Sequence, residues 1–196
     1  MPLRVPALPP QAPRNGNAFS RWFGRSVLRL GGWTIAGQFP DVPRLVLIAA
    51  PHSSGWDAVW GLAAKLAMGV DITFMAKAEL FRGPLGWLLR ALGGLPIDRA
   101  RAQGSVEQAA SRIRESDKMW FVLAPEGTRR HVRQWKSGFL RIARAADVPV
   151  FAAWFHYPDK TIGLGELFEL GDDPAVDMAR IRAYYRPFLG KHRGTV

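Results

Sequence analysis

The apolar run Leu45–Ala50 constrains the fold of this chain most, because the segment PHSSGWD follows it directly at positions 51–57. Consecutive aliphatic residues closed by a proline predict a strand that is buried on both faces, as in a parallel sheet. The two serines and the glycine after the proline can cap a helix that begins near Trp56. His52 and Asp57 would then lie at the carboxyl end of a buried strand, where open α/β sheets bind their ligands.

The spacing between His52 and Asp57 limits how the two side chains can meet. Positions five apart on one helix point about 140° away from each other, so His52 must lie in the turn and Asp57 in the first helical turn. Asp57 could then accept the ring N–H of His52, which fixes the tautomer and leaves the other nitrogen to take a proton from a hydroxyl. The alternative is a capping turn in which His52 only binds backbone, and the pair alone does not separate the two.

Composition narrows the class of protein. The chain has 196 residues, of which 48% are hydrophobic, and this suits one globular domain with a substantial core. It has no cysteine, which excludes disulfides and thiolate metal sites and fits a reducing compartment. Because it has neither an apolar run of about 18 residues nor an apolar signal core, we expect a cytoplasmic protein without a transmembrane segment. Its net charge of +11 indicates an anionic partner: a phosphate-bearing substrate, a membrane surface or nucleic acid.

The N-terminal part divides into two segments. Residues 1–18 carry five prolines and predict a disordered lead. From Phe19 onward, aromatic and aliphatic residues recur at helical spacing, with Arg21, Arg25 and Arg29 on another face. A basic helix with bulky aromatics opposite is typical of an anchor that lies in the headgroup region, so we expect a membrane-surface helix over 19–33. The alternative is an ordinary surface helix that packs its aromatics on the core.

Strands and helices alternate along the rest of the chain. This pattern predicts one α/β domain over 19–196, with a mixed, mostly parallel sheet flanked by helices and a basic amphipathic helix at its start. Strands are expected at 45–50, 71–76, 119–124 and 148–155, with a short extended piece at 95–97. Helices are expected at 58–68, 84–92, 104–117, 137–146 and 173–185. The glycines at 163 and 165 predict a hairpin over 161–170.

Basic residues collect at and after two of the strand ends. Lys77 follows the second strand, where it could meet a substrate anion or remain solvated. Six Arg and Lys residues and no acidic residue lie between Gly127 and Arg144, and arginine is suited to bidentate phosphate recognition. Glu126 could hold the Arg129 guanidinium or bind a substrate hydroxyl, while Arg141 and Arg144 are expected on a solvated face. Nucleic acid is disfavoured, because no nucleic-acid-binding motif accompanies the charge.

Three blocks in this order resemble the glycerolipid acyltransferase family, the 1-acylglycerol-3-phosphate acyltransferases and their relatives. They are HSSGWD at 52–57, LPIDR at 95–99 and PEGTR at 125–129. The segments MAKAELF at 75–81 and WKSGFLRIARAADVPV at 135–150 are also similar to the family's blocks. The likeness covers a motif-bearing core over 44–155, and the ordered set is far more specific than any single motif.

The resemblance implies a reaction and a set of residues. An acyl group would pass from acyl-CoA or acyl carrier protein to the hydroxyl of a lysophospholipid-like acceptor, by default 1-acylglycerol-3-phosphate, without a cofactor or metal. His52 would be the general base and Asp57 would orient it, while Arg99 and Arg129 would bind the acceptor phosphate. The further substrate-binding candidates are Lys77, Glu126, Gly127 and Thr128. Such a protein would work at the cytoplasmic face of a membrane.

Two other functions fit parts of the sequence. A non-catalytic peripheral membrane module could bind anionic lipid with the same basic face. A metal-dependent hydrolase could use His52, Asp57, His131 and His156, but these residues lack the spacing of a metal-ligand cluster.

Overall fold

The computed structural model describes residues 3–97 and 102–192, and its helices and strands follow the predicted alternation except for an additional strand at Thr34–Gly37, which was not predicted. The strands are β1 (Thr34–Gly37), β2 (Arg44–Ala50), β3 (Ile72–Lys77), β4 (Gly94–Ile97), β5 (Met119–Leu123), β6 (Val150–His156) and β7 (Thr161–Phe168). The helices are α1 (Ala18–Gly31), α2 (Trp56–Met68), α3 (Gly83–Ala91), α4 (Ala102–Glu115), α5 (Gly138–Ala146) and α6 (Pro174–Tyr184), with a 3₁₀ turn η1 at Ala78–Phe81.

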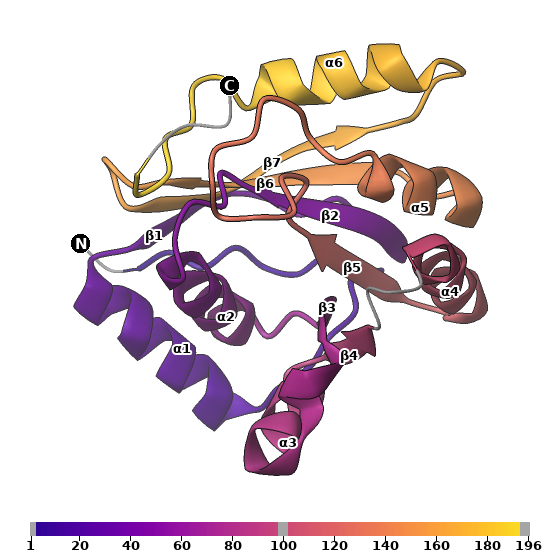
Figure 1. Ribbon diagram of the computed structural model, residues 1–196. Coiled ribbons are helices and arrows are strands. Elements are labelled where there is room, and N and C mark those ends of the chain that lie inside the picture. The colour runs from indigo at the N-terminus through magenta and orange to yellow at the C-terminus, as the bar shows by residue number, and fades with distance from the viewer. Residues whose placement is uncertain (1–2, 98–101, 193–196) are drawn as a thin grey trace.

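In this part of the chain the strands form one sheet in the order β1-β7-β6-β2-β5-β3-β4 (Figure 1). All neighbouring strands run parallel except β6 and β7, which are antiparallel. β2 lies in the centre, between β5 and β6. The predicted α/β domain with a mixed, mostly parallel sheet is therefore confirmed.

The central strand is buried on both faces, as its sequence predicts. Val46 and Ile48 belong to a core that includes the buried sides of α4, α5 and α6. Leu45 and Leu47 point the other way, into a second core with residues of α1 and α2. Because side chains alternate along a strand, one apolar run supplies both cores and produces a three-layer arrangement of helices, sheet and helices (Figure 1).

The hairpin predicted over residues 161–170 is wrong. This stretch is the single strand β7, and the hairpin is formed by β6 and β7 around the turn that follows His156. Gly163 packs under the Trp154 ring, since a Cβ built on it would lie 1.8 Å from the Trp154 Cε2 atom. The glycine therefore makes room for an aromatic ring across the strands, a requirement that sequence alone does not distinguish from a turn.

Residues 1–18 were expected to be a disordered lead, and the structure shows residues 3–17 of this segment packed on the domain. Ala12 is buried, and the Pro13 carbonyl accepts a hydrogen bond of 2.9 Å from the Asp71 amide. Lys118 Nζ donates to the Pro10 carbonyl at 2.9 Å. These partners lie more than 50 positions away in the sequence, so the local composition of the segment does not reveal them.

Helix α1 packs closely on α2. A Cβ at Gly24 would lie 2.5 Å from the Ala63 carbonyl oxygen, so the two backbones approach without a side chain between them. Leu28 is fully buried in the same interface. Over the described residues, no helix is both long and apolar enough to cross a bilayer.

Candidate active site

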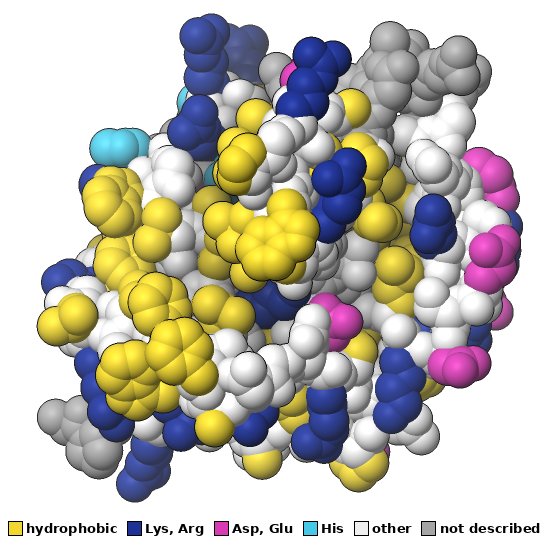
Figure 2. Space-filling view, turned by 90° about the horizontal axis from the view of Figure 1, so that it is seen from below, with side chains coloured by type: hydrophobic (Ala, Val, Ile, Leu, Met, Phe, Trp, Pro, Cys, Tyr) yellow, Lys and Arg dark blue, Asp and Glu magenta, His cyan; other side chains and the backbone are white. Residues whose placement is uncertain are grey.

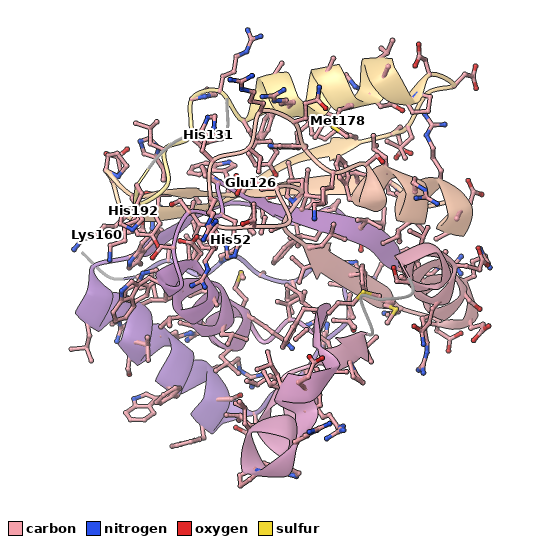
Figure 3. All side chains as sticks on the ribbon, in the orientation of Figure 1. His52, Glu126, His131, Lys160, Met178 and His192 are labelled. Atoms are coloured by element: carbon pink, nitrogen blue, oxygen red, sulfur yellow. The ribbon has the colours of Figure 1, made fainter. Side chains whose placement is uncertain are left out.

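Three neighbouring parallel strands bring the candidate site together. β5, β2 and β6 lie side by side, with Ile48 paired to Leu123 and Ala50 paired to Trp154. Their carboxyl ends therefore meet at one edge of the sheet, and the segments that follow carry Glu126, His52 and Tyr157. In Figure 3, His52 lies close to Glu126 at this edge, next to His192 of the C-terminal segment.

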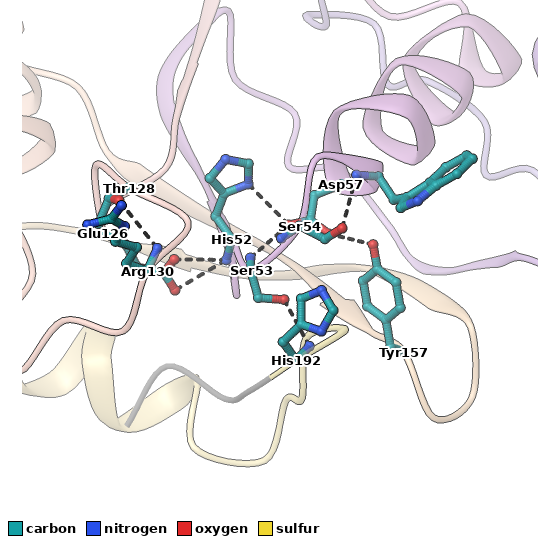
Figure 4. A network of polar contacts seen from close by, with 10 residues as sticks. His52, Ser53, Ser54, Asp57, Glu126, Thr128, Arg130, Tyr157 and His192 are labelled. Carbon is teal, nitrogen blue, oxygen red and sulfur yellow. Dashed lines mark hydrogen bonds and ion pairs between the residues drawn. The ribbon is translucent and has the colours of Figure 1, made fainter.

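His52 and Asp57 form the contact that their spacing allows. His52 Nδ1 lies 3.2 Å from Asp57 Oδ2, and the two side chains are 28% and 1% exposed. α2 begins at Trp56, so His52 lies in the preceding turn and Asp57 in the first helical turn, as predicted (Figure 4). With the Nδ1 proton directed at the carboxylate, the Nε2 atom carries the lone pair that can accept a proton.

Both oxygens of the Asp57 carboxylate accept hydrogen bonds. Oδ2 also accepts the Ser53 and Ser54 backbone N–H groups, each at 2.8 Å, and Oδ1 accepts the Tyr157 hydroxyl (Figure 4). Burial by itself raises the pKa of Asp57, but the hydrogen bonds from His52, Tyr157 and Ser54 outweigh it, so the pKa lies below its ordinary value. The carboxylate is therefore ionised at neutral pH, and it can stabilise a positive charge on the His52 ring.

Tyr157 is a site residue that was not predicted from the sequence. It directly follows β6, and its ring packs edge-on against Trp33 at a centroid distance of 4.9 Å. Burial and the bond to Asp57 raise the pKa of the Tyr157 hydroxyl, so it remains a proton donor. Its position just after a predicted buried strand was the only available signal.

Glu126 supports the histidine from the backbone side. Its carboxylate is fully buried and accepts the His52 backbone N–H, at 3.0 Å to Oε2 and 3.2 Å to Oε1. Of the two roles suggested for Glu126, an ion pair with Arg129 is not seen among the described residues, and binding of a substrate hydroxyl stays a prediction. The carboxylate instead links the loop after β5 to the loop after β2.

Gly127 and Thr128 shape the loop after β5. Gly127 has φ +65° and a Cβ there would lie 2.8 Å from Lys136 Cδ, so the turn requires a residue without a side chain. The Thr128 hydroxyl accepts the Arg130 backbone N–H at 3.3 Å. Both residues therefore act on the loop backbone in this structure.

Of the predicted cations, Arg129 lies beside the helix start. Its Nη1 atom is 3.0 Å from the position that a Gly55 Cβ would occupy, which places the guanidinium against the first residues of α2. β3 and β4 end at the same edge of the sheet, farther from β2. The Lys77 side chain and all of Arg99 lie outside the described residues.

Arg144 was expected on a solvated face, and this is wrong. Its guanidinium donates to the buried Asp177 carboxylate at 2.7 Å and to the Gly171 carbonyl at 2.6 Å. It therefore ties α5 to the start of α6. Arg141 is exposed on α5, as expected.

Of the four residues proposed for a metal site, His52 and Asp57 are in contact with each other, whereas the other two histidines are placed differently. His131 is exposed on the loop after β5, while His156 Nδ1 accepts the Leu189 backbone N–H at 3.1 Å. Within residues 3–97 and 102–192, no three His, Asp or Glu side chains gather closely enough to hold a metal ion.

The comparisons with known proteins bear on the fold and on the family. A crystal structure of the 1-acyl-sn-glycerophosphate (LPA) acyltransferase PlsC from Thermotoga maritima superposes with a TM-score of 0.61, at 16% sequence identity, covering 85% of this chain and 77% of that one. The fold is therefore that of PlsC. A search of the curated proteins found no match.

The sequence itself identifies the family. It matches the family described as Acyltransferase over residues 38–156, which is more than half of the chain. The chain belongs to the acyltransferase family, and it has a PlsC-like fold. The matched region contains His52, Asp57 and the loop after β5, and it ends one residue before Tyr157.

Proposed function

We propose that this protein transfers a fatty acyl group from acyl-CoA or acyl carrier protein to the hydroxyl of a lysophospholipid, by default 1-acylglycerol-3-phosphate. The observation that carries the proposal is the contact of His52 Nδ1 with Asp57 Oδ2, at 3.2 Å, in which the carboxylate is buried and held by three further donors. This arrangement supports a role for the His52 imidazole as general base at the carboxyl end of β2.

The proposed reaction is direct transfer. Nε2 of His52 takes the proton of the acceptor hydroxyl as its oxygen attacks the thioester carbonyl, and the buried Asp57 stabilises the imidazolium that forms. The tetrahedral intermediate then collapses, the carbon–sulfur bond breaks, and the thiolate takes the proton back from His52. No covalent enzyme intermediate is needed, because the acceptor is itself the nucleophile.

The acceptor phosphate is assigned to arginines. The family resemblance gives this role to Arg99 and Arg129, and the position of Arg129 beside Gly55 supports it, because a phosphate bound there would lie next to the helix that carries Asp57. Guanidinium groups bind phosphate oxygens through paired N–H donors.

We propose that the protein acts at an anionic membrane surface. This is supported by the large apolar side chains that α1 and α3 expose. Phe19 and Trp22 are 69% and 61% exposed on α1, and Trp87 is 73% exposed on α3. Figure 2 views the molecule from the side of these helices, where hydrophobic side chains lie among lysines and arginines. Aromatic residues surrounded by cations suit the headgroup region of a bilayer.

The test is thioester-dependent acylation of lysophosphatidate by the purified protein and by His52→Ala. We expect the substitution to lower kcat by about 10²–10⁴, the usual contribution of a positioned base. The fold should be retained, because the histidine ring is partly exposed. If both proteins bind lipid vesicles and neither transfers the acyl group, the chain is a lipid-binding module and the proposal fails.

A further inference from the structure

A hollow beside the candidate site includes residues that the family match does not reach. Its volume is about 420 Å³, and it lies against the start of α2. The residues that line it are Ser54, Gly55, Trp56, Val59, Lys191 and His192. The last two come from the C-terminal segment, far beyond residue 156, where the family match ends.

The C-terminal segment is fastened to the site at several points. The Leu189 carbonyl accepts the Tyr157 backbone N–H at 2.9 Å, and the Leu189 backbone N–H donates to His156 Nδ1 at 3.1 Å. The His192 backbone N–H then donates to the Ser53 hydroxyl at 3.4 Å (Figure 4). Residues 189–192 therefore run from the end of β6 to the loop that carries His52.

Lys191 contacts the first of three aromatic rings that pack on one another down to the core. Its Nζ atom lies 5.5 Å from the centroid of the Trp56 ring, in a cation–π contact. Trp56 stacks on Trp60, and Trp60 packs against Trp33, which is only 3% exposed. The core thus supports the surface that holds the ammonium, so less conformational entropy is lost when Lys191 binds a ligand.

Two cations beside the hollow lack an acidic partner. Among the described residues, neither the Lys191 ammonium nor the Arg129 guanidinium has a hydrogen-bond or ion-pair partner. Both lie next to the start of α2, with Trp56 under the ammonium and Gly55 beside the guanidinium. Asp57, the acidic residue of this turn, is buried and has its own donors. The positive charge at this site therefore remains available to an anionic ligand.

We propose that Lys191 binds a phosphoryl group of a substrate in this hollow. The inference rests on the proposed function, because it assigns the ligand to the acyl-transfer reaction. Two substrates can supply the phosphoryl group: the thioester donor and the lysophospholipid acceptor. In either case Lys191 adds a specificity-determining cation that the family blocks do not contain, on a wall that the C-terminal segment builds.

The test compares wild type, Lys191→Ala and Lys191→Arg with two pairs of substrates. The donor pair is acyl-CoA and the acyl thioester of N-acetylcysteamine, and the acceptor pair is lysophosphatidate and monoacylglycerol. We expect Lys191→Ala to raise the KM of one phosphate-bearing substrate about tenfold, a loss typical of one charge-assisted hydrogen bond. Its phosphate-free counterpart should be unaffected, and Lys191→Arg should recover most of the loss. The pair that responds identifies the source of the phosphate.

Arg186→Ala is the matched control, because it removes one exposed positive charge from the same end of the chain. Unchanged KM values in Lys191→Ala, or equal changes with and without the phosphate, would overturn the inference. Calorimetric titration with coenzyme A and with glycerol 3-phosphate tests Lys191 independently of turnover. An inactive wild type would refute the proposed function. The role of Lys191 would then be tested by whether its substitution weakens the binding of coenzyme A or of glycerol 3-phosphate in these titrations.

Discussion

The Tyr157 hydroxyl donates a hydrogen bond to Oδ1 of Asp57, the carboxylate oxygen opposite the one that contacts His52. Tyr157 follows β6 and Asp57 lies at the start of α2, 100 positions earlier in the chain. The bond thus connects the end of β6 to the start of α2, the helix that follows β2, through a charged group that is almost fully buried. Its energetic contribution should depend on whether that group is ionised.

Tyr157→Phe should reduce stability in a pH-dependent way. The pKa of Asp57 is depressed in the folded state, so its ionised form adds stability above its unfolded pKa, and this stability is lost as the pH falls through the folded pKa. Loss of the hydroxyl should raise the folded pKa and cost about 1–3 kcal/mol at pH 7. The difference from wild type should shrink as the pH falls below about 4. Urea unfolding across this range measures it.

Tyr185→Phe is the matched control for that experiment. Tyr185 is fully buried, and its hydroxyl donates to the carbonyls of Ile48 and Ala153, each at 3.0 Å. These acceptors are neutral, so the cost of this substitution should not vary between pH 3 and 8. A Tyr157→Phe penalty that is equally flat would show that Asp57 is not the group involved.

Glu126→Gln should lower both stability and turnover. The substitution keeps the size of the side chain but removes the charge that accepts the His52 backbone N–H. Hydrogen bonds to charged groups are roughly twice as strong as neutral ones, so we expect a loss of about 1–2 kcal/mol at neutral pH. A less firmly held His52 backbone should also reduce kcat. Denaturant melts and initial rates measure the two effects, and a variant that matches wild type in both would contradict this support role.

Arg129→Ala should weaken binding of the acceptor more than binding of the thioester donor. Loss of a bidentate guanidinium–phosphate contact corresponds to about a 10–100-fold rise in the KM for lysophosphatidate. Arg141→Ala removes the same charge from the exposed side of α5 and should leave that KM unchanged. Steady-state kinetics with each substrate varied in turn would separate the two. Equal effects of the two substitutions would mean that only net charge matters.

Trp22→Gln combined with Trp87→Gln should reduce binding to anionic vesicles. The two rings lie on α1 and α3, are among the most exposed large apolar side chains of the described chain, and would lose their contact with the lipid interface. Binding of wild type should also fall with rising salt, because the net charge of +11 contributes attraction to the surface. Vesicle sedimentation at two salt concentrations measures both effects.

The control for vesicle binding is Val176→Gln. The Val176 side chain is 61% exposed, and its helix, α6, lies on the opposite side of the sheet from α3 (Figure 1). Point substitutions are preferable to removal of α1, because Leu28 and Gly24 of that helix cover α2. If the double variant and the control sediment alike with anionic vesicles, the membrane face lies elsewhere.

Much of the site was accessible from the sequence because its parts are local. The apolar run Leu45–Ala50 specifies a strand that can be buried only with a layer on each face, and Pro51 ends it. The five-residue spacing then leaves one way for His52 and Asp57 to meet. Strand ends were predicted to within a few residues for the same reason, since the alternation of apolar segments and helical patterns is a property of neighbouring positions.

Tertiary structure alone decided which distant residues complete the site. Glu126 accepts the His52 amide and Tyr157 binds Asp57 only because β5, β2 and β6 are adjacent in the sheet, and strand order is not encoded in any one segment. Lys191 likewise reaches Trp56 through the path of the C-terminal segment. Local pattern thus determined most of the elements and the contact of His52 with Asp57, whereas contacts between segments far apart in the chain depend on how the two cores pack on the sheet.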